Sequence, residues 1–188
     1  MTASIAGFPG PPDALAILDF WRQAGPAMWF AKDDAFDRRF RDSFLRLYRA
    51  AERGDLSSWL ETPEGALALV LLLDQFPRNA FRGTPAMYAT DTVARKAARS
   101  AIEAGHDRAV PADLAVFFYL PFGHSESIAD QRQCLALTEW LDEQTRSRAR
   151  HHHDIVQRFG RFPHRNAILG RTTTAEEQRY LDSDGYKG

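Results

Sequence analysis

The stretch TPEGALALVLLLDQFPRN, residues 62–79, decides the fold that we expect for this chain. Thr62 can cap a helix, and Pro63 suits the first helical position, where a missing N–H costs no helical hydrogen bond. The run 67–73 is apolar on nearly every side, as in a helix enclosed by other elements. We therefore predict a central helix that ends at Pro77, because proline breaks the helical ladder.

Helical spacing continues on both sides of this stretch. In residues 33–53, Phe36, Phe40 and Phe44 recur every four residues, which places them on one helical face. The chain has 46 Ala and Leu residues but only 11 Val and Ile residues, a bias that favours helices over strands. The predicted helices span 13–24, 33–53, 62 to the stop at Pro77, 90–104, 111–120, 127–144, 146–159 and a short last helix that Thr174 and Glu177 begin.

These helices define the expected architecture. Seven or eight helices joined mostly by short loops predict an all-α fold, an antiparallel helical array or an irregular bundle. The 188 residues fit one domain, 1–188, with the Gly- and Pro-rich segment 1–12 as a loose lead-in. No strict period of 34 residues is visible, so the sequence alone does not establish a repeat protein.

Composition excludes several classes of protein. A net charge of −1 with 26% charged residues is not typical of a protein that binds nucleic acid over its whole surface, of an acidic tail or of a disordered chain. Cys134 is the single cysteine and cannot form an internal disulfide, which indicates a reducing compartment. No signal peptide or membrane-length apolar run is visible, so we expect a cytoplasmic protein without a membrane partner.

Two segments carry similar polar residues around a Phe-Pro pair. They are DQFPRNAFRGT, residues 74–84, and GRFPHRNAILGRT, residues 160–172. On stiff loops, their guanidinium forks and carboxamides could converge on one carboxylate or phosphate. The alternative is that they cap helix ends and bind backbone carbonyls. The candidate ligand-binding residues are Arg78, Asn79, Arg82, Arg161, His164, Arg165, Asn166 and Arg171.

Histidines and acids supply candidate acid–base groups. His152 shares an apolar stripe with Ala149 and Val156, so it points inward, either as a core histidine or as an active group. His124 follows a helix break and could pair with Glu126 or Asp130, although helix capping explains this segment equally well. The candidate catalytic residues are His124, Glu126, His152 and Asp74. Residues 151–153 are three consecutive histidines, which diverge around a helix, so we expect no metal and no cofactor.

Positive charge is concentrated near the C-terminus. Residues 146–171 hold seven arginines and one acid, Asp154. A basic segment with interleaved aromatic residues could meet nucleic acid. Because the cations are arginines rather than lysines, directed recognition of a small anion fits this segment better.

Three segments resemble the signature blocks of the bacterial domain-of-unknown-function family 924. They are LDQFPRN at 73–79, FFYLP at 117–121 with HSE at 124–126, and FGRFPHRNAILGR at 159–171. The resemblance spans roughly residues 14–181 and implies an all-helical fold similar to tetratricopeptide-repeat hairpins, with His152 as a signature histidine. This chain has Gly123 where the family pattern has a bulkier residue, a change that bears on pocket width. The family carries no established reaction.

Two functional hypotheses follow. The first is an uncharacterised protein that binds a small anionic molecule in a pocket lined by Arg, Asn and His, with hydrolysis as the default reaction. The second is a protein-interaction scaffold, by analogy with tetratricopeptide repeats, and a homo-oligomer is compatible with either. The first requires that both Phe-Pro segments, His124 and His152 line one concave pocket.

Overall fold

The computed structural model describes residues 11–183 and 185–186, and all regular elements within them are helices. In this described part of the chain, eight α-helices have eight or more residues, in agreement with the seven or eight predicted. Part of the predicted lead-in, residues 1–10, lies outside the described residues, and Pro12 already begins the first helix. The α-helices are α1 Pro12–Ala24, α2 Pro26–Trp29, α3 Asp34–Arg53, α4 Pro63–Val70, α5 Phe76–Ala80, α6 Asp91–Glu103, α7 His106–Ala109, α8 Ala112–Gly123, α9 Ile128–Thr138, α10 Glu143–Phe159 and α11 Ala175–Asp182.

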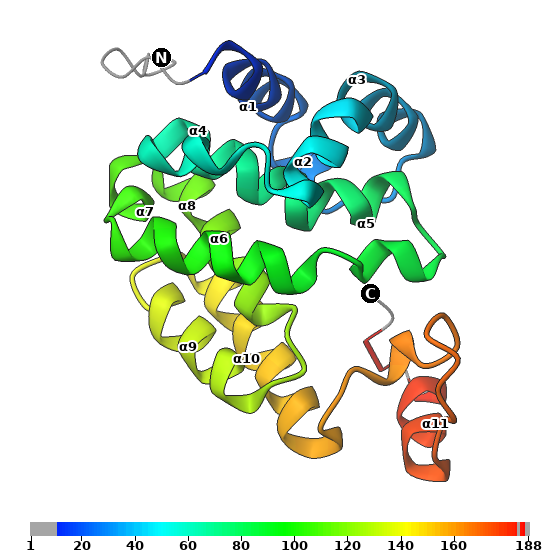
Figure 1. Cartoon of the computed structure of the whole chain (residues 1–188). Coiled ribbons are helices and arrows are strands. Elements are labelled where there is room, and N and C mark those ends of the chain that lie inside the picture. Colours follow the sequence, from blue (N-terminus) through cyan, green and yellow to red (C-terminus); the bar gives the residue numbers. More distant parts are fainter. Residues whose placement is uncertain (1–10, 184, 187–188) are drawn as a thin grey trace.

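The helices pack in the order of the chain. In Figure 1, α1 and α3 cover the layer formed by α4 and α5, and α6 lies against the other side of that layer. Next, α6 packs on α8, α8 on α9, and α9 on α10, while α11 stands at the end of the molecule. The predicted all-α class is confirmed, and the tetratricopeptide-repeat-like arrangement stays a prediction.

The predicted central helix is present as α4. Its residues 64–70 are all buried, and it packs against α1, α6 and α8. The side chain of Thr62 accepts a hydrogen bond from Gly65 N at 3.2 Å, so this helix begins as its sequence predicts. Burial on every side requires an apolar run without a polar face, which explains why the segment lacks amphipathic spacing.

The predicted stop at Pro77 is wrong, because the helix continues through it. A π-helical turn, η2 Leu71–Gln75, widens the backbone and joins α4 to α5. Pro77 has no N–H to donate to Leu73, four residues earlier. The Leu73 carbonyl instead accepts a hydrogen bond from Thr90 Oγ1 at 2.5 Å, so its hydrogen bond is replaced from outside the helix.

Other predicted boundaries shift by a few residues. Pro121 lies inside α8 rather than ending it, and the helix ends at Gly123. Gln131 Nε2 donates to the carbonyls of Gly123 at 2.8 Å and Ser125 at 2.7 Å, which satisfies backbone acceptors at that end. The helix predicted to reach 144 ends at Thr138 as α9, because Asp142 caps a new helix by accepting from Thr145 N at 3.0 Å.

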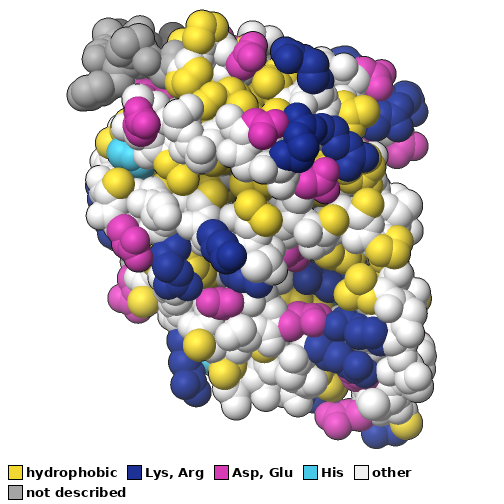
Figure 2. All heavy atoms as spheres, viewed as in Figure 1, with side chains coloured by type: hydrophobic (Ala, Val, Ile, Leu, Met, Phe, Trp, Pro, Cys, Tyr) yellow, Lys and Arg dark blue, Asp and Glu magenta, His cyan; other side chains and the backbone are white. Residues whose placement is uncertain are grey.

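Charges of both signs are mixed over the surface. Figure 2 shows Lys and Arg interspersed with Asp and Glu on one face of the molecule. The arginine-rich segment is largely paired, as in Arg146–Glu143, Arg158–Glu176 and Arg161–Glu177. Within residues 11–183 and 185–186, no helix is both long enough and apolar enough to cross a membrane.

Candidate functional site

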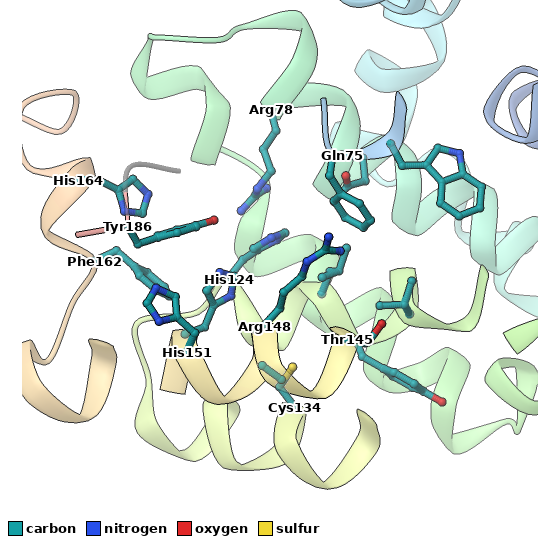
Figure 3. A pocket seen from close by; sticks show the side chains of 18 of the residues that line it. Gln75, Arg78, His124, Cys134, Thr145, Arg148, His151, Phe162, His164 and Tyr186 are labelled. Carbon is teal, nitrogen blue, oxygen red and sulfur yellow. The ribbon is translucent and has the colours of Figure 1, made fainter. Parts of the chain in front are cut away.

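A cavity of about 680 Å³ lies where α5, α8, α10 and the loop after α10 meet. Figure 3 shows Arg78 reaching into it from α5 and Arg148 from α10, with the Tyr186 hydroxyl directed toward the same space. Seven of the predicted site residues line this cavity: Arg78, Asn79, Arg82, His124, His152, His164 and Arg165. The two Phe-Pro segments and the two histidines therefore meet, as the ligand hypothesis requires.

The cavity wall is rich in donors and positive charge. Its lining includes four arginines and four histidines, and no Asp or Glu of the described residues belongs to it. The acids stand behind the arginines instead. Arg78 Nη1 lies 3.2 Å from Asp74 Oδ1 and 2.9 Å from Asp91 Oδ1, and it donates to the Asp74 carbonyl at 2.7 Å. These carboxylates hold the Arg78 guanidinium from the side away from the cavity, so the groups that face the cavity are hydrogen-bond donors.

Arg165 is held rigidly in a buried position. Its guanidinium carbon lies 4.5 Å from the Tyr88 ring centre and 4.6 Å from that of Phe162. Its Nη2 donates to the His124 carbonyl at 2.9 Å, and Nη1 lies 3.6 Å from Asp91 Oδ2. Its Nε is buried without a hydrogen-bond partner among the described residues, as is Arg78 Nη2. Burial and the nearby Arg78 lower the pKa of Arg165 below its ordinary value.

His124 pairs with Asp74, not with Glu126 or Asp130 as the sequence suggested. Its Nδ1 lies 2.8 Å from Asp74 Oδ1, a contact that holds the proton on Nδ1 and leaves Nε2 as an acceptor. Burial and Arg78 lower the pKa of His124, so the ring is neutral at pH 7. Burial alone would raise the pKa of Asp74. The nearby Arg78 and His124 outweigh burial and lower the pKa below its ordinary value, so this carboxylate is ionised. Asp130 instead accepts a hydrogen bond from Ser125 at 2.6 Å.

His152 and His164 form a ring cluster with Tyr186 at the cavity wall. The Tyr186 ring centre lies 4.9 Å from that of His152 and 5.0 Å from that of His164. The His152 ring also contacts Phe162, at 5.5 Å between centres, and His124, at 6.3 Å. Burial lowers the pKa of both His152 and His164 to about 3. Both rings are therefore neutral near pH 7.

Asn79 and Arg82 border the cavity, but the protein itself binds their polar groups. Asn79 Nδ2 donates to Asp37 Oδ1 at 2.6 Å, and Arg82 Nε donates to Asp37 Oδ2 at 2.8 Å. Asp37 belongs to α3 and is buried. This pair of contacts fastens α5 to α3, which is the structural alternative that the sequence left open.

Arg161, Asn166 and Arg171 lie away from the cavity lining and hold the last loop. Arg161 and Asn166 both donate to Glu177, at 2.6 and 3.2 Å. Arg171 donates to both Glu126 oxygens, at 2.6 and 2.9 Å, and Glu126 also accepts from Phe162 N at 2.8 Å. Burial would raise the pKa of Glu126, but Arg171 and the Phe162 amide lower it. Glu126 thus ties the loop to the end of α8 instead of pairing with His124.

The model of the family described as "Bacterial protein of unknown function (DUF924)" matches residues 17–185. The chain belongs to this family. The resemblance seen in the three sequence blocks is therefore confirmed. Two of those blocks carry the residues just described, Asp74, Arg78 and Asn79 in the first and Arg161 to Arg171 in the last. The block between them supplies His124 and Glu126.

A solved structure supports the fold of this DUF924 chain. It is a protein of unknown function from Agrobacterium tumefaciens, 56% identical, with a TM-score of 0.89. The match covers 90% of this chain and 97% of the other. Among curated proteins, none matches the sequence.

Four residues of the site in this DUF924 protein had no assigned role from sequence. Arg148 is the one with a usable signal, because it lies one helical turn before His152 on α10. Tyr88 and Asp91 lie three residues apart, just before and at the start of α6, Tyr186 follows α11, and none of them carries a local pattern that points to the cavity. Within the described residues, no group of three His, Cys, Asp or Glu side chains could hold a metal ion.

Proposed function

We propose that this protein binds a small anionic molecule in the cavity, against Arg78 and Arg165. The observation that carries the proposal is the arrangement of charge, with guanidinium and imidazole groups facing the cavity and carboxylates placed behind them. A preorganised donor needs little reordering when a ligand arrives, which favours binding. Arg165 is preorganised by its two aromatic neighbours and its bond to the His124 carbonyl.

Unpaired nitrogen atoms beside the cavity support the same proposal. Arg165 Nε and His164 Nδ1 are both buried without a hydrogen-bond partner among the described residues. Arg165 Nε always carries a proton, so it is a donor that lacks an acceptor, which costs free energy. A bound anion can supply an acceptor to this guanidinium, which keeps its charge even where burial lowers its pKa.

Hydrolysis is the reaction class that we attach to this site. Asp74 holds the proton of His124 on Nδ1, so Nε2 can accept a proton from water as the water oxygen bonds to the phosphorus or carbonyl carbon of a bound ester. The bond from that atom to the leaving-group oxygen breaks, and the leaving group departs with the electron pair of that bond. The arginines would then bind the charge of the substrate and of the departing anion. Because His124 is neutral at pH 7, it is in the protonation state that a general base requires.

The scaffold hypothesis has less support from the surface. The large apolar side chains exposed in the described part of the chain lie on different elements, such as Leu45 on α3, Val93 on α6 and Trp140 after α9. A docking groove would gather such side chains into one patch. Phe30 is also exposed, but it belongs to the cavity.

Thermal stabilisation by anions tests the binding proposal. We expect phosphate or acetate to raise the melting temperature of the wild-type protein more than chloride does at equal ionic strength. Arg165→Met should raise the anion concentration needed for the same stabilisation at least about tenfold, since it removes a positive charge and a charge-assisted donor. Arg158→Met, which removes an exposed arginine paired with Glu176, is the matched control and should leave the effect unchanged.

The fold of the variant must be checked in the same samples. Circular dichroism should show unchanged helical content for Arg165→Met, and Arg165→Lys keeps the charge if the methionine variant is unstable. Equal stabilisation of wild type and both Arg165 variants by phosphate and acetate would contradict the proposal.

The reaction class has its own measurement. We expect slow release of 4-nitrophenol from 4-nitrophenyl phosphate or from mono-4-nitrophenyl succinate, two anionic esters. His124→Asn should reduce that rate by about 100-fold, the usual contribution of a general base. A rate that is unchanged in the variant would remove His124 from this role.

A further inference from the structure

The cavity has two chemically different ends. The helical geometry of α8 and of the cap residue that follows it places Val116, Leu120 and His124 on one face, because they are four residues apart. Val116 and Leu120 are apolar, and Trp29 and Phe30 from α2 and the residue after it also line the cavity. Arg78, Arg165 and the rings of His124, His152 and His164 lie in the other part of the wall.

Ring contacts place the apolar end opposite the polar end. The Phe30 ring stacks on Phe117 at 6.0 Å between centres, and the Arg148 guanidinium lies 4.8 Å from the centre of Phe30. At the other end, the His124 and His152 rings lie 6.3 Å apart. Along α8 the chain thus passes from Phe117 toward His124, and along α10 it passes from Arg148 toward His152, in the same direction.

The helical rise gives the separation of the two groups of residues along each helix. Seven residues separate Phe117 from His124, which corresponds to about 10 Å along α8 at 1.5 Å per residue. Four residues separate Arg148 from His152, or about 6 Å along α10. A volume of about 680 Å³ is far more than one phosphate or acetate ion fills, so a ligand held by Arg78 and Arg165 has room for a body that extends toward Phe30.

We infer that the ligand is an amphipathic organic anion, with its acidic group at Arg78, His124 and Arg165 and an apolar body against Val116, Leu120 and Phe30. This inference rests on the proposed function and specifies the class of molecule bound. A purely hydrophilic anion would leave the apolar end filled with water, whereas an alkyl or aryl body removes that surface from water. Arg148 keeps its guanidinium on the Phe30 ring, which presents a flat stacking surface to such a body.

A series of carboxylates measured by titration calorimetry at constant ionic strength tests this inference. The probes are acetate, butyrate, hexanoate and 3-phenylpropanoate, with phosphate and adipate as hydrophilic comparisons. We expect about fourfold tighter binding for each added methylene up to hexanoate, the effect of burying one CH₂ group. Hexanoate should bind more tightly than adipate, whose second carboxylate would either face Val116 and Leu120 or draw Arg148 away from the Phe30 ring.

Two variants at the apolar end sharpen the measurement. Phe30→Ala changes a side chain that is 48% exposed, and Leu120→Asn replaces an apolar side chain with a polar one of similar size. Each should weaken hexanoate binding about tenfold and leave acetate binding unchanged. Val93→Ala, an exposed apolar side chain of α6 outside the cavity, is the control and should change neither.

The outcomes separate this inference from the proposed function. If acetate and phosphate bind through Arg165 but affinity does not rise with chain length, or adipate binds better than hexanoate, the amphipathic ligand is wrong and anion binding stands. If hexanoate binds equally well to wild type and Arg165→Met, its charge is not recognised, and both fail. Absence of binding by every anion in the series also overturns both.

Discussion

Gly123 shows how one residue without a side chain permits close packing beside the cavity. It is the last residue of α8 and lines the cavity immediately before His124. A Cβ at this position would lie 3.1 Å from Cys134 Sγ and 3.7 Å from His152 Nδ1. The first distance is too short for ordinary packing and the second is normal contact, so the glycine makes room chiefly for the buried Cys134.

A double-mutant cycle tests this relation. Gly123→Ala should lower the free energy of unfolding by about 1 kcal/mol, because overpacking forces Cys134 to move. In a Cys134→Ala background the same change should be neutral or stabilising, since the clash is gone and alanine favours helix. Urea denaturation of the four proteins gives the coupling; an equal cost in both backgrounds would show that the sulfur is not the obstacle.

At the scale of elements, the π-turn between α4 and α5 places the first Phe-Pro segment. Such turns are frequent at functional sites, because an extra residue in the helix re-aims the side chains that follow it. Here Asp74 lies in the turn and Arg78 one turn later, so both reach the cavity region from one continuous helical segment. The turn depends on Thr90, which lies just before α6 and binds the carbonyl that Pro77 leaves unpaired.

Removing the Thr90 hydroxyl should therefore destabilise this junction. Thr90→Val leaves the buried Leu73 carbonyl without its donor, which should cost about 1–3 kcal/mol of unfolding free energy. Thr90→Ser keeps the hydroxyl and should cost less than half as much. Chemical denaturation measures both, and a valine variant as stable as the serine variant would show that this hydrogen bond contributes little.

At the scale of the whole molecule, burial of neutral histidines makes stability depend on pH. The pKa of His152 and of His164 is about 3 in the folded protein and about 6.5 in an unfolded chain. Above pH 6.5 both states are neutral and the two histidines add no pH dependence. Between pH 6.5 and 3 the unfolded state binds protons that the folded state does not, so stability falls as pH falls.

The expected size of this effect is measurable. From pH 7 to pH 5.5, each histidine should reduce the free energy of unfolding by about 1 kcal/mol. Replacing His152 with Gln, which cannot titrate, should remove about half of the combined loss. Denaturation at a series of pH values checks this, and a wild-type stability that stays constant down to pH 5.5 would contradict the burial of neutral rings.

The sequence by itself determined the helices and most of their starts, because caps and apolar spacing act over a few residues. Thr62, Asp33 and the Thr174–Glu177 capping box begin helices as predicted. Local rules failed where a distant residue intervened, as when Thr90 replaced the hydrogen bond missing at Pro77 and allowed the helix to continue.

Only the tertiary structure decided which of the similar Arg and Asn residues face the cavity. Asp37 accepts hydrogen bonds from Asn79 and Arg82, which lie more than 40 positions away in the sequence. Glu126 accepts hydrogen bonds from Arg171, which lies 45 positions away. Arg78 and Arg165 share Asp91 and keep donors at the cavity. Ion pairs form wherever packing brings opposite charges together, so they depend on the fold and not on the sequence spacing. For this reason the corresponding Arg and Asn residues of the two Phe-Pro segments differ in whether they face the cavity or bind the protein itself.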